Sequence, residues 1–463
     1  MNKPVEFDPG VVTELRLLLG DRVSTSAAVR EHHGKDESYF PHALPDVVVY
    51  PGTTEEVREV VNICRAHRVP MIPYGVGTSL EGHILAIHGG VSIDLSQMNK
   101  VLAVHEEDLD AVVQAGVTRK QLNEHIKHTG LFFPIDPGAD ATLGGMTATR
   151  ASGTNAVRYG TMRENVLSLK VVLADGRVIQ TSRRAKKSAA GYDLTRIFVG
   201  SEGTLGIITE VTVKLYPMQE AMSAAVCAFP TIDGAAKTVI QTLQMGIPVA
   251  RSELLCGTTM NALNRYNKWS YRESPTLFLE FHGTEAAVVE QAKAVQEIAR
   301  ENGGLDFQWA TKQEERSKLW EARHHAYFAC LQLRPGSRAL STDVCVPISR
   351  LAECIAETTK DIEKASRPIP LFGHVGDGNF HLVILIDPGN RAEVEEAKAI
   401  NVRVIQRALA MEGTCTGEHG IGIGKQPYLR QELGEDVLAV MRDLKRMFDP
   451  ENLMNPGKVV SLE

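Results

Sequence analysis

The sequence contains no Cys-x-x-Cys pair, no apolar run of eighteen residues and no excess of basic charge. Its seven cysteines are an odd, unclustered set, which indicates a reducing compartment and excludes iron–sulfur, zinc-ribbon and disulfide frameworks. Because no long apolar run occurs at the N-terminus or later, we expect neither a signal peptide nor a transmembrane segment. We therefore expect a cytoplasmic protein, with a peripheral position at the inner face of the membrane as the alternative.

Charge and length set further limits. The 50 Lys plus Arg and 57 Asp plus Glu give a formal charge of −7, which argues against a nucleic-acid partner because such proteins need a basic surface. The one basic run, residues 183–187, is interpreted as a solvated loop, with a docking patch as the alternative. At 463 residues the chain exceeds the length of about 250–300 residues at which one core stops growing, so we expect two domains.

Two histidines bracket a turn in the stretch GHVGDGNFH, residues 373–381. His374 and His381 are seven residues apart, which in one extended strand would place them on opposite faces, but glycines in the turn can re-aim one of them. The stretch GEHG, residues 417–420, adds a carboxylate and another imidazole. Two imidazoles and a carboxylate are the ligand set of an open catalytic divalent-metal site. We predict such a site here, with ordinary polar loop residues as the alternative.

Two stretches rich in glycine indicate a bound cofactor. The first, residues 70–82, reads PMIPYGVGTSLEG, and its glycines let backbone N–H groups converge on an anion while Thr78 and Ser79 add donors. It matches neither G-x-G-x-x-G nor a Gly-Lys-Ser/Thr ending, and a plain turn is the alternative. The second, residues 134–166, is dense in Gly, Ala, Ser and Thr. We interpret it as a long loop without elements of its own that lies against a cofactor.

Other segments predict regular elements. Strands are expected at residues 47–50, 91–95 and 207–215, a helix at 118–128 ended by Gly130, and a β-hairpin at 169–181 turning at Asp175-Gly176. A further helix is expected from Thr311 to residue 333, with Trp320, Arg323 and Tyr327 on its apolar stripe. An arginine on a buried face needs an anionic partner, which is either an internal carboxylate or a substrate.

Several strings resemble the vanillyl-alcohol-oxidase-type FAD-binding fold. They are residues 73–82, residues 136–160, GSEGTLGIITEVT at 200–212 and FDPENLMNPGK at 448–458. Within that fold the chain is similar to the glycolate oxidase and D-lactate dehydrogenase branch. The strings RPGSRALSTDVCVPISRL, GHVGDGNFH and GTCTGEHGIG resemble those of the mitochondrial-type D-lactate dehydrogenases. The resemblance covers nearly the whole chain from Asp46.

The resemblance implies an α+β fold in two domains. A two-part FAD-binding domain is expected at residues 1–218, and a substrate-binding α+β cap with an antiparallel sheet at 219–410. The C-terminal segment, 411–463, is expected to return to the FAD domain and complete the active site. FAD is expected to be non-covalent, because the glycine-rich loop carries no histidine or cysteine attachment pattern and His83 lies beyond the turn. The residues expected to contact FAD are Tyr74, Gly75, Gly77, Thr78, Ser79, Pro137, Thr142, Gly144, Gly145, Ser152, Gly153, Asn155, Tyr159, Gly160, Glu202, Gly206, Ile208 and Asn455.

The same resemblance implies oxidation of a D-2-hydroxy acid by hydride transfer to flavin N5, with D-lactate as the expected substrate. His374, His381 and Glu418 would hold a divalent metal, zinc or manganese. Arg323 would hold the substrate carboxylate, as the matching arginine does in the family, and His419 would be the general base.

Relatives that oxidise D-2-hydroxyglutarate use a lysine near residues 339–343, which here carry no cation, so a monocarboxylate is favoured. The electrons would pass to an acceptor other than NAD: a quinone, a cytochrome or an electron-transfer flavoprotein. A glycolate oxidase flavin subunit that needs iron–sulfur partners and a non-redox flavin-binding protein remain alternatives. A homodimer is one arrangement that the sequence leaves open.

Overall fold

The computed structural model describes residues 8–462, apart from the side chains of residues 321, 322 and 324. The chain forms two compact units. The first unit consists of Met1–Ser152, Gly160–Met218 and Glu418–Glu463, and the second of Gly153–Tyr159 and Gln219–Gly417. The chain thus returns to the first unit at Glu418, whereas the sequence-based division is at residue 411. Nothing in the sequence indicated that the short segment Gly153–Tyr159 belongs to the second unit.

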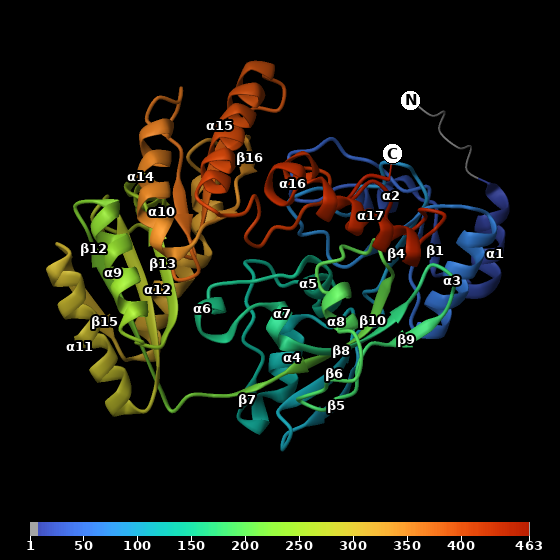
Figure 1. Ribbon diagram of the computed structural model, residues 1–463, viewed down its shortest axis with the longest axis horizontal. Helices are drawn as coiled ribbons and strands as arrows, with labels where there is room; N and C mark the ends of the chain where they lie inside the picture. Colours follow the sequence, from blue (N-terminus) through green and yellow to red (C-terminus); the bar gives the residue numbers. More distant parts are fainter. Residues whose placement is uncertain (1–7, 463) are drawn as a thin grey trace. The chain divides into compact units, whose positions relative to one another are not determined.

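One half of the first unit is a small, mostly parallel sheet. Its strand order is β1 (Val23–Ser24), β2 (Val47–Val49), β4 (Val91–Asp94) and β3 (Met71–Tyr74), and β2, β4 and β3 run parallel. Helices α1 (Pro9–Leu19) and α3 (Thr54–Ala66) pack against it (Figure 1). The Thr53 hydroxyl caps α3 by accepting from the Glu56 N–H, and the apolar face of α3 is fully buried. Strand β3 also pairs with Met454, which ties the C-terminal segment into this core.

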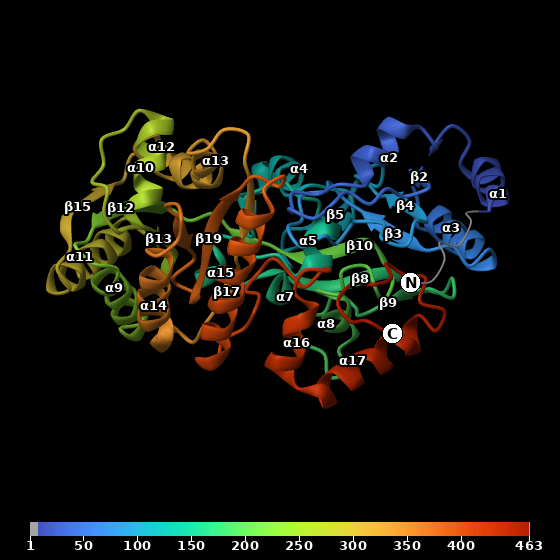
Figure 2. The same cartoon turned by 90° about the horizontal axis from the view of Figure 1, so that it is seen from above.

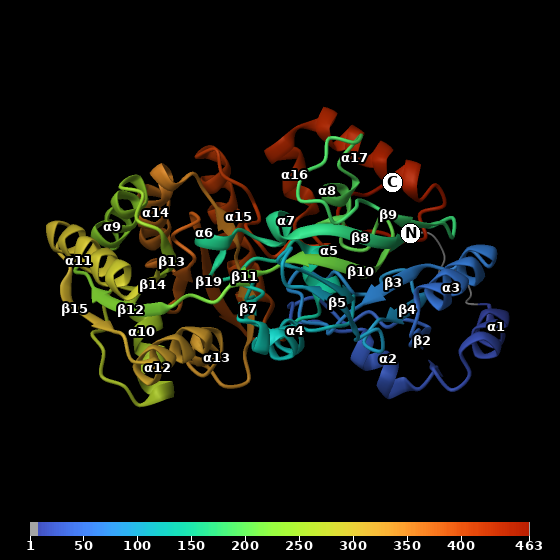
Figure 3. The same cartoon turned by 90° about the horizontal axis from the view of Figure 1, so that it is seen from below.

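The other half of the first unit is an antiparallel sheet of five strands. Their order is β5 (Val101–His105), β6 (Asp110–Gln114), β10 (Ile207–Lys214), β8 (Val166–Val172) and β9 (Val178–Gln180). Helix α17 (Glu435–Phe448) and the short α8 (Leu194–Phe198) lie on one side of it (Figure 3), where Leu444 and Phe448 of α17 pack on its core. The expected hairpin is confirmed, with Gly176 at a φ of 84° in its turn.

The prediction that residues 134–166 lack elements is wrong. They contain three short helices, α5 (Leu143–Thr149), α6 (Ala156–Tyr159) and α7 (Met162–Asn165). The hydroxyl residues that suggested a loop are helix caps, since Thr142 accepts from the Gly145 N–H and Thr161 forms a capping box with Glu164. The small residues permit close packing: a Cβ on Gly144 would lie 2.6 Å from the Cβ of Ala115.

The second unit is built on an antiparallel sheet, which confirms the expected α+β cap. Its strand order is β15 (Leu305–Ala310), β12 (Ala221–Ala228), β14 (Thr276–Gly283), β13 (Val249–Leu255), β18 (Leu371–Gly373), β19 (Asn379–Ile386) and β16 (Arg338–Ser341), with β17 (Val344–Cys345) also on β19.

Helices cover both faces of this sheet (Figures 2 and 3). One face carries α10 (Gly257–Asn267), α12 (Gln313–His324) and α13 (Ala326–Leu331); the other carries α9 (Ile232–Gln244), α11 (Glu285–Glu301) and α14 (Leu351–Ile362). The single helix expected from Thr311 to residue 333 is wrong, because α12 and α13 are separate and His325 lies between them. Trp320 and Tyr327 still pack in one apolar cluster, as the stripe predicted.

The remaining elements complete the two units. They are α2 (Ala27–His33), α4 (Arg119–Ile126), the 3-10 helices at Lys127–Thr129 and Ile348–Arg350, β7 (Leu131–Phe132), β11 (Tyr216–Pro217), α15 (Arg391–Ala410) and α16 (Gln426–Leu433). Helix α4 begins after the capping residue Thr118, and the 3-10 turn that follows it ends at Gly130 with a φ of 71°, as predicted. Among residues 8–462, no helix has both the length and the apolar character needed to cross a membrane.

Candidate functional site

The two histidines of the GHVGDGNFH stretch lie on one face of the second unit's sheet. In the β18–β19 hairpin Phe372 is directly opposite His381. His374 comes two residues after Phe372, so its side chain returns to the same face. Because the chain reverses direction at the turn between them, the odd number of residues no longer places the two histidines on opposite faces. Their imidazole centroids are 5.6 Å apart. Gly378, at a φ of 81°, is required in this turn because a Cβ there would lie 2.1 Å from the Val346 carbonyl oxygen.

Hydrogen bonds determine which nitrogen of each imidazole carries the proton. His374 Nδ1 lies 2.7 Å from Glu253 Oε1, and His381 Nδ1 lies 3.0 Å from the carbonyl oxygen of Thr342. A carbonyl oxygen and an ionised carboxylate only accept, so in the neutral rings both Nδ1 atoms are protonated. The lone pair is then on Nε2 in both residues. Metal-binding histidines have this arrangement, with the outer N–H donated to a carboxylate or carbonyl.

Glu253 links this pair to the predicted substrate arginine. It lies on β13, whose Leu254 is opposite Gly373, so Glu253 comes opposite His374. Its carboxylate has no solvent exposure and contacts Arg323 through Nε at 2.7 Å and Nη2 at 2.6 Å. Burial opposes ionisation of Glu253, but Arg323 and His374 hold the pKa of its carboxyl below its usual value.

Arg323 is buried on α12, with 7% of its surface exposed and its guanidinium 4.9 Å from the ring centre of Phe372. The internal ion pair left open by the sequence is therefore present, on Glu253. Only the Nε and Nη2 edge of the fork faces that carboxylate. The guanidinium has five N–H donors, so its Nη1 and Nη2 edge can serve a second anion. Arg323 can therefore hold a substrate carboxylate without losing Glu253.

Two residues near His381 had no assigned role in the sequence. Asp343 is fully buried, accepts from Asn379 Nδ2 at 2.8 Å and from the Thr416 hydroxyl at 2.7 Å, and lies 3.6 Å from His381 Nδ1. Asn379 also donates to the Val344 carbonyl at 2.9 Å. The strand pattern around them is apolar, so a buried Asp and Asn were a usable signal that the sequence reading missed.

Glu418 and His419 open the last segment of the first unit. Gly417, the residue before them, belongs to the second unit, where a Cβ would lie 2.2 Å from Asn379 Nδ2. The roles of Glu418 as a metal ligand and of His419 as a base remain predictions.

In the first unit, the glycine-rich loop after β3 provides an anion cradle. Within the described part of the chain, the backbone N–H groups of residues 75–80 donate no hydrogen bond. A Cβ on Gly75 would lie 2.7 Å from Thr142 Oγ1, so this loop and the start of α5 lie side by side. Tyr74 ends β3 beside them, and burial raises the pKa of its hydroxyl to about 12. A row of N–H donors beside hydroxyl side chains fits a phosphate group.

The other predicted FAD residues divide between the two units. Those in the first unit lie in several places. Gly144, Gly145, Ser152 and Gly160 lie in or next to the short helices, Pro137 precedes α5, Gly206 directly precedes β10, Ile208 lies in β10, and Glu202 and Asn455 lie in loops. Gly153, Asn155 and Tyr159 belong to the second unit. There Asn155 accepts from Arg251 Nε at 2.9 Å, and the Tyr159 hydroxyl lies 2.9 Å from His282 Nδ1.

Asp36 supports the glycine-rich loop and was missed entirely. Its carboxylate accepts from the Ser79 hydroxyl at 3.2 Å and from the Gly82 N–H at 3.0 Å, and it is 8% exposed. The polar sequence around it gave no periodic signal, so only the tertiary structure identifies it.

Two family descriptions match the chain. Residues 45–182 match the FAD binding domain, and residues 218–459 match the C-terminal domain of FAD linked oxidases. A probable mitochondrial D-lactate dehydrogenase of Danio rerio is 54% identical over 98% of this chain and 92% of its own length. The mitochondrial D-lactate dehydrogenase [cytochrome] of Arabidopsis thaliana is 48% identical over 97% of this chain and 80% of its own length. The glycolate oxidase subunit GlcD of Bacillus subtilis is 36% identical over 90% of this chain and 89% of its own length.

Solved structures share the fold at low sequence identity. A p-cresol methylhydroxylase with substrate bound has a TM-score of 0.80 and 20% identity, covering 98% of this chain and 97% of its own. An alkyldihydroxyacetonephosphate synthase has a TM-score of 0.78 and 22% identity, covering 99% and 87%. The expected fold of the vanillyl-alcohol-oxidase type is confirmed by these neighbours and the two matched domains.

Proposed function

Because the chain belongs to the FAD-linked oxidases, in the family of the D-lactate dehydrogenases, we propose that it oxidises D-lactate to pyruvate. It is an FAD-dependent oxidoreductase. Identity to a D-2-hydroxyglutarate dehydrogenase of Stutzerimonas stutzeri is lower, at 30%, which agrees with a monocarboxylate substrate. Relatives named for cytochrome favour a cytochrome as the electron acceptor over a quinone or an electron-transfer flavoprotein.

The cytoplasmic location expected from the sequence is wrong. The relatives from Danio rerio, Arabidopsis thaliana, Kluyveromyces lactis and Saccharomyces cerevisiae are mitochondrial proteins, which points to a mitochondrial location. The expectation rested on composition and on the lack of an apolar leader, and neither property distinguishes these compartments.

The observation that carries the proposed substrate class is the shared contact of Arg323 and His374 with Glu253. Through this contact Arg323 and His374 lie on opposite sides of one buried acid. Arg323 is the cation for the substrate carboxylate, and His374 is an imidazole with its lone pair on Nε2. A 2-hydroxy acid needs such a pair, because its carboxylate and hydroxyl are on adjacent carbons. Arg323 would bind the carboxylate as a fork and so orient the carbon that loses hydrogen.

The histidines fit a divalent metal, because both Nδ1 atoms are held by acceptors. His374, His381 and Glu418 would hold the ion, zinc or manganese. When bound, it would lower the pKa of the substrate hydroxyl, as metals do for bound water. Oxidation to the 2-oxo acid removes one proton from that hydroxyl and a hydride, a hydrogen with two electrons, from the carbon that carries the hydroxyl. His419 would accept the proton, for which an imidazole with a pKa of about 6.5 is suited near neutral pH.

The first unit fits FAD through its glycine cradle. Residues 75–80 would bind the phosphates with backbone N–H groups, and Thr142 and Thr78 would add hydroxyl donors, whereas the Ser79 hydroxyl already donates to Asp36. FAD, when bound, supplies the acceptor for the two electrons.

The experiment that tests the proposed function is anaerobic mixing of the purified protein with D-lactate, L-lactate and glycolate while the flavin absorbance is recorded. We expect D-lactate to bleach the flavin fastest. A flavin that no hydroxy acid bleaches would contradict the proposal and favour a non-redox flavin-binding protein.

A glycolate oxidase subunit is the second candidate, favoured by the 36% identity to GlcD. The two differ in what a single chain can do. A dehydrogenase should reduce an artificial dye with D-lactate when purified alone, whereas the subunit should turn over only with partner chains and with glycolate.

We predict that FAD is bound without a covalent link. Acid precipitation should release the yellow colour to the supernatant, because the loop that cradles the cofactor offers glycines and hydroxyls but no histidine or cysteine among residues 73–82. Colour that stays with the pellet would contradict this and make His83 the first residue to test.

We predict that Arg323→Lys slows oxidation of D-lactate about ten- to hundred-fold while FAD content stays at the parent level. A lysine keeps the charge near Glu253 but cannot form a second bidentate edge, and one lost charge-assisted hydrogen bond accounts for a change of this size. The measurements are kcat/KM and the ratio of flavin to protein absorbance.

Arg407→Lys is the matched control, because Arg407 is a partly buried arginine of this unit that contacts an acid, Asp361, at 3.3 Å and has no proposed role in the site. It should change kcat/KM far less. An unchanged rate of D-lactate oxidation in Arg323→Lys would contradict the substrate-binding role, and the ion pair with Glu253 would then be the only role of Arg323.

A further inference from the structure

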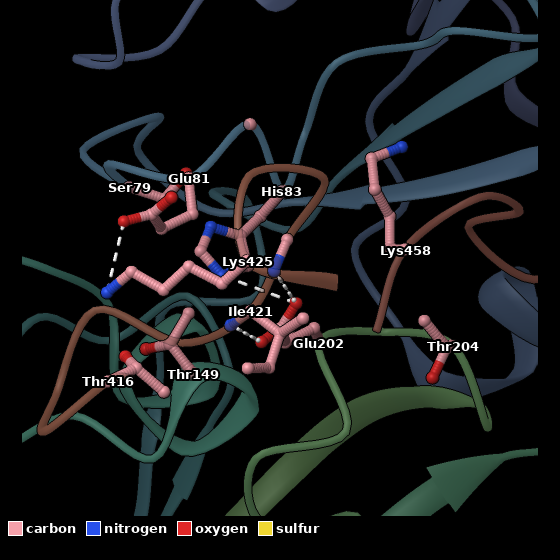
Figure 4. A network of polar contacts seen from close by, with 12 residues as sticks. Ser79, Glu81, His83, Thr149, Glu202, Thr204, Thr416, Ile421, Lys425 and Lys458 are labelled. Carbon is pink, nitrogen blue, oxygen red and sulfur yellow. Dashed lines mark hydrogen bonds and ion pairs between the residues drawn. The ribbon is translucent and has the colours of Figure 1, made fainter. Parts of the chain in front are cut away.

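Glu202 binds the loop that follows Glu418 and His419. Its carboxylate accepts from the backbone N–H of Ile421 at 2.7 Å and of Gly422 at 2.8 Å (Figure 4). All of these residues belong to the first unit. A carboxylate that accepts from two consecutive N–H groups fixes the backbone between them, because neither peptide can rotate without breaking a charge-assisted bond.

The backbone of Glu202 is itself held in place. The residue has a φ of 53°, a conformation that residues other than glycine rarely adopt. Its N–H donates to the Ala148 carbonyl at 2.8 Å, and its own carbonyl accepts from Asn455 Nδ2 at 2.8 Å. With 6% of its surface exposed, the side chain points into the loop from a fixed base.

His83, in a turn of the loop between β3 and β4, completes the contact. Its Nε2 lies 3.3 Å from Glu202 Oε2, at ion-pair distance, and the residue is 3% exposed. Gly420 passes directly over this pair: at its φ of 83° a Cβ would lie 2.7 Å from both Glu202 Oε1 and His83 Nε2. Only a glycine fits there, and it is the residue next to His419.

A second anchor lies a few residues further on. The Ile423 N–H donates to the Glu81 carbonyl at 2.9 Å, and Lys425 Nζ lies 3.2 Å from Glu81 Oε1 (Figure 4). The loop is therefore bound at consecutive positions by two buried acids. Without them a segment with glycines at 417, 420 and 422 would sample many conformations.

We propose that Glu202 is a positioning residue, whose carboxylate fixes the loop 418–425 and thereby the directions of the Glu418 and His419 side chains. This inference rests on the proposed function, in which Glu418 binds a metal and His419 accepts a proton. It assigns to Glu202 a role in the reaction that does not depend on contact with FAD.

The test variant is Glu202→Gln in the FAD-loaded full chain. Glutamine has the same size, but one of its terminal atoms is an N–H donor that faces a backbone N–H, so one of the two bonds is lost. Glu202→Asp is the second variant, which keeps the charge beside His83 but cannot reach both N–H groups.

Asp449→Asn is a matched control within the same unit. Asp449 is 1% exposed, accepts from the consecutive N–H groups of Leu453 and Met454 at 3.0 and 2.8 Å, and pairs with the buried Lys445. It repeats the architecture around Glu202 but holds a loop without either reacting side chain. If Glu202 contributes only to the stability of the fold, Glu202→Gln and Asp449→Asn should have the same effects.

Two readouts separate positioning from stability. Amide hydrogen exchange in a peptide covering residues 418–425 should become about tenfold faster or more in Glu202→Gln and stay at the parent level in Asp449→Asn. After chelation, titration with Mn²⁺ alone should give an affinity about 10- to 100-fold weaker in Glu202→Gln, with Asp449→Asn at the parent value. Glu202→Asp should fall between these in both readouts.

Parent-like exchange in both Glu202 variants overturns the inference, and so does faster exchange with unchanged Mn²⁺ affinity. If the parent protein binds no Mn²⁺, the metal part of the proposed function is wrong. The exchange rates then still decide whether Glu202 fixes the loop.

Discussion

Replacing His419 by asparagine is expected to slow flavin reduction by D-lactate about 100- to 10,000-fold, the usual effect of removing a general base. Asparagine keeps a polar side chain of similar reach but cannot accept a proton near neutral pH. Bound metal and FAD should both remain, because the proposed ligands of each are other residues. The measurements are the anaerobic reduction rate, the metal content by elemental analysis and the flavin content.

His128→Asn is the control for this variant, since His128 lies exposed in the 3-10 turn after α4. It should reduce its flavin at the parent rate. A parent rate in His419→Asn would require another base. If His419→Asn loses the metal and Glu418→Ala keeps it, the two roles are exchanged.

Replacing His374, His381 or Glu418 by alanine is expected to remove the bound metal together with activity. The loss should be at least about a hundredfold, because a divalent cation contributes several kcal/mol to a transition state with a developing alkoxide. FAD should stay, since its expected phosphate cradle is residues 75–80. Chelation of the parent should reproduce the loss, and Zn²⁺ or Mn²⁺ should restore activity.

A histidine of the same sheet is the control for metal content. His282 is 4% exposed and lies 2.7 Å from Glu280 through Nε2, so His282→Ala disturbs a comparable buried pair. It should retain its metal. Metal retained in all three ligand variants would show that these residues hold none.

Local elements could be predicted because their signals are local. The helix that begins after Thr118 and the turn closed by Gly130 lie within a dozen residues, and the hairpin at Gly176 depends on a single positive φ. The histidine pair was predicted as a cluster for the same reason, since a short turn determines the relation of His374 to His381. The helices in residues 134–166 were missed because hydroxyl caps and small packing residues resemble loop composition.

The residues that hold the site in place could not be predicted, because their partners are distant in sequence. Glu253 meets His374 across 121 positions, and Glu202 meets Ile421 across 219. Nothing in a chain specifies such pairings before the strand order is known. Glu253, a charged residue in an apolar strand, was a local indication that β13 contributes to the proposed site.

The carboxylate of Glu253 makes the two proposed binding events interdependent. Its negative charge is divided between Arg323 and His374. An anion bound to the outer edge of Arg323 weakens the pull of the guanidinium on Glu253, and the carboxylate then accepts more strongly from His374. A stronger acceptor at Nδ1 makes Nε2 a better electron-pair donor to a cation. We therefore expect positive cooperativity between the proposed metal and substrate, and thermodynamic linkage then requires each to raise the affinity for the other by the same factor.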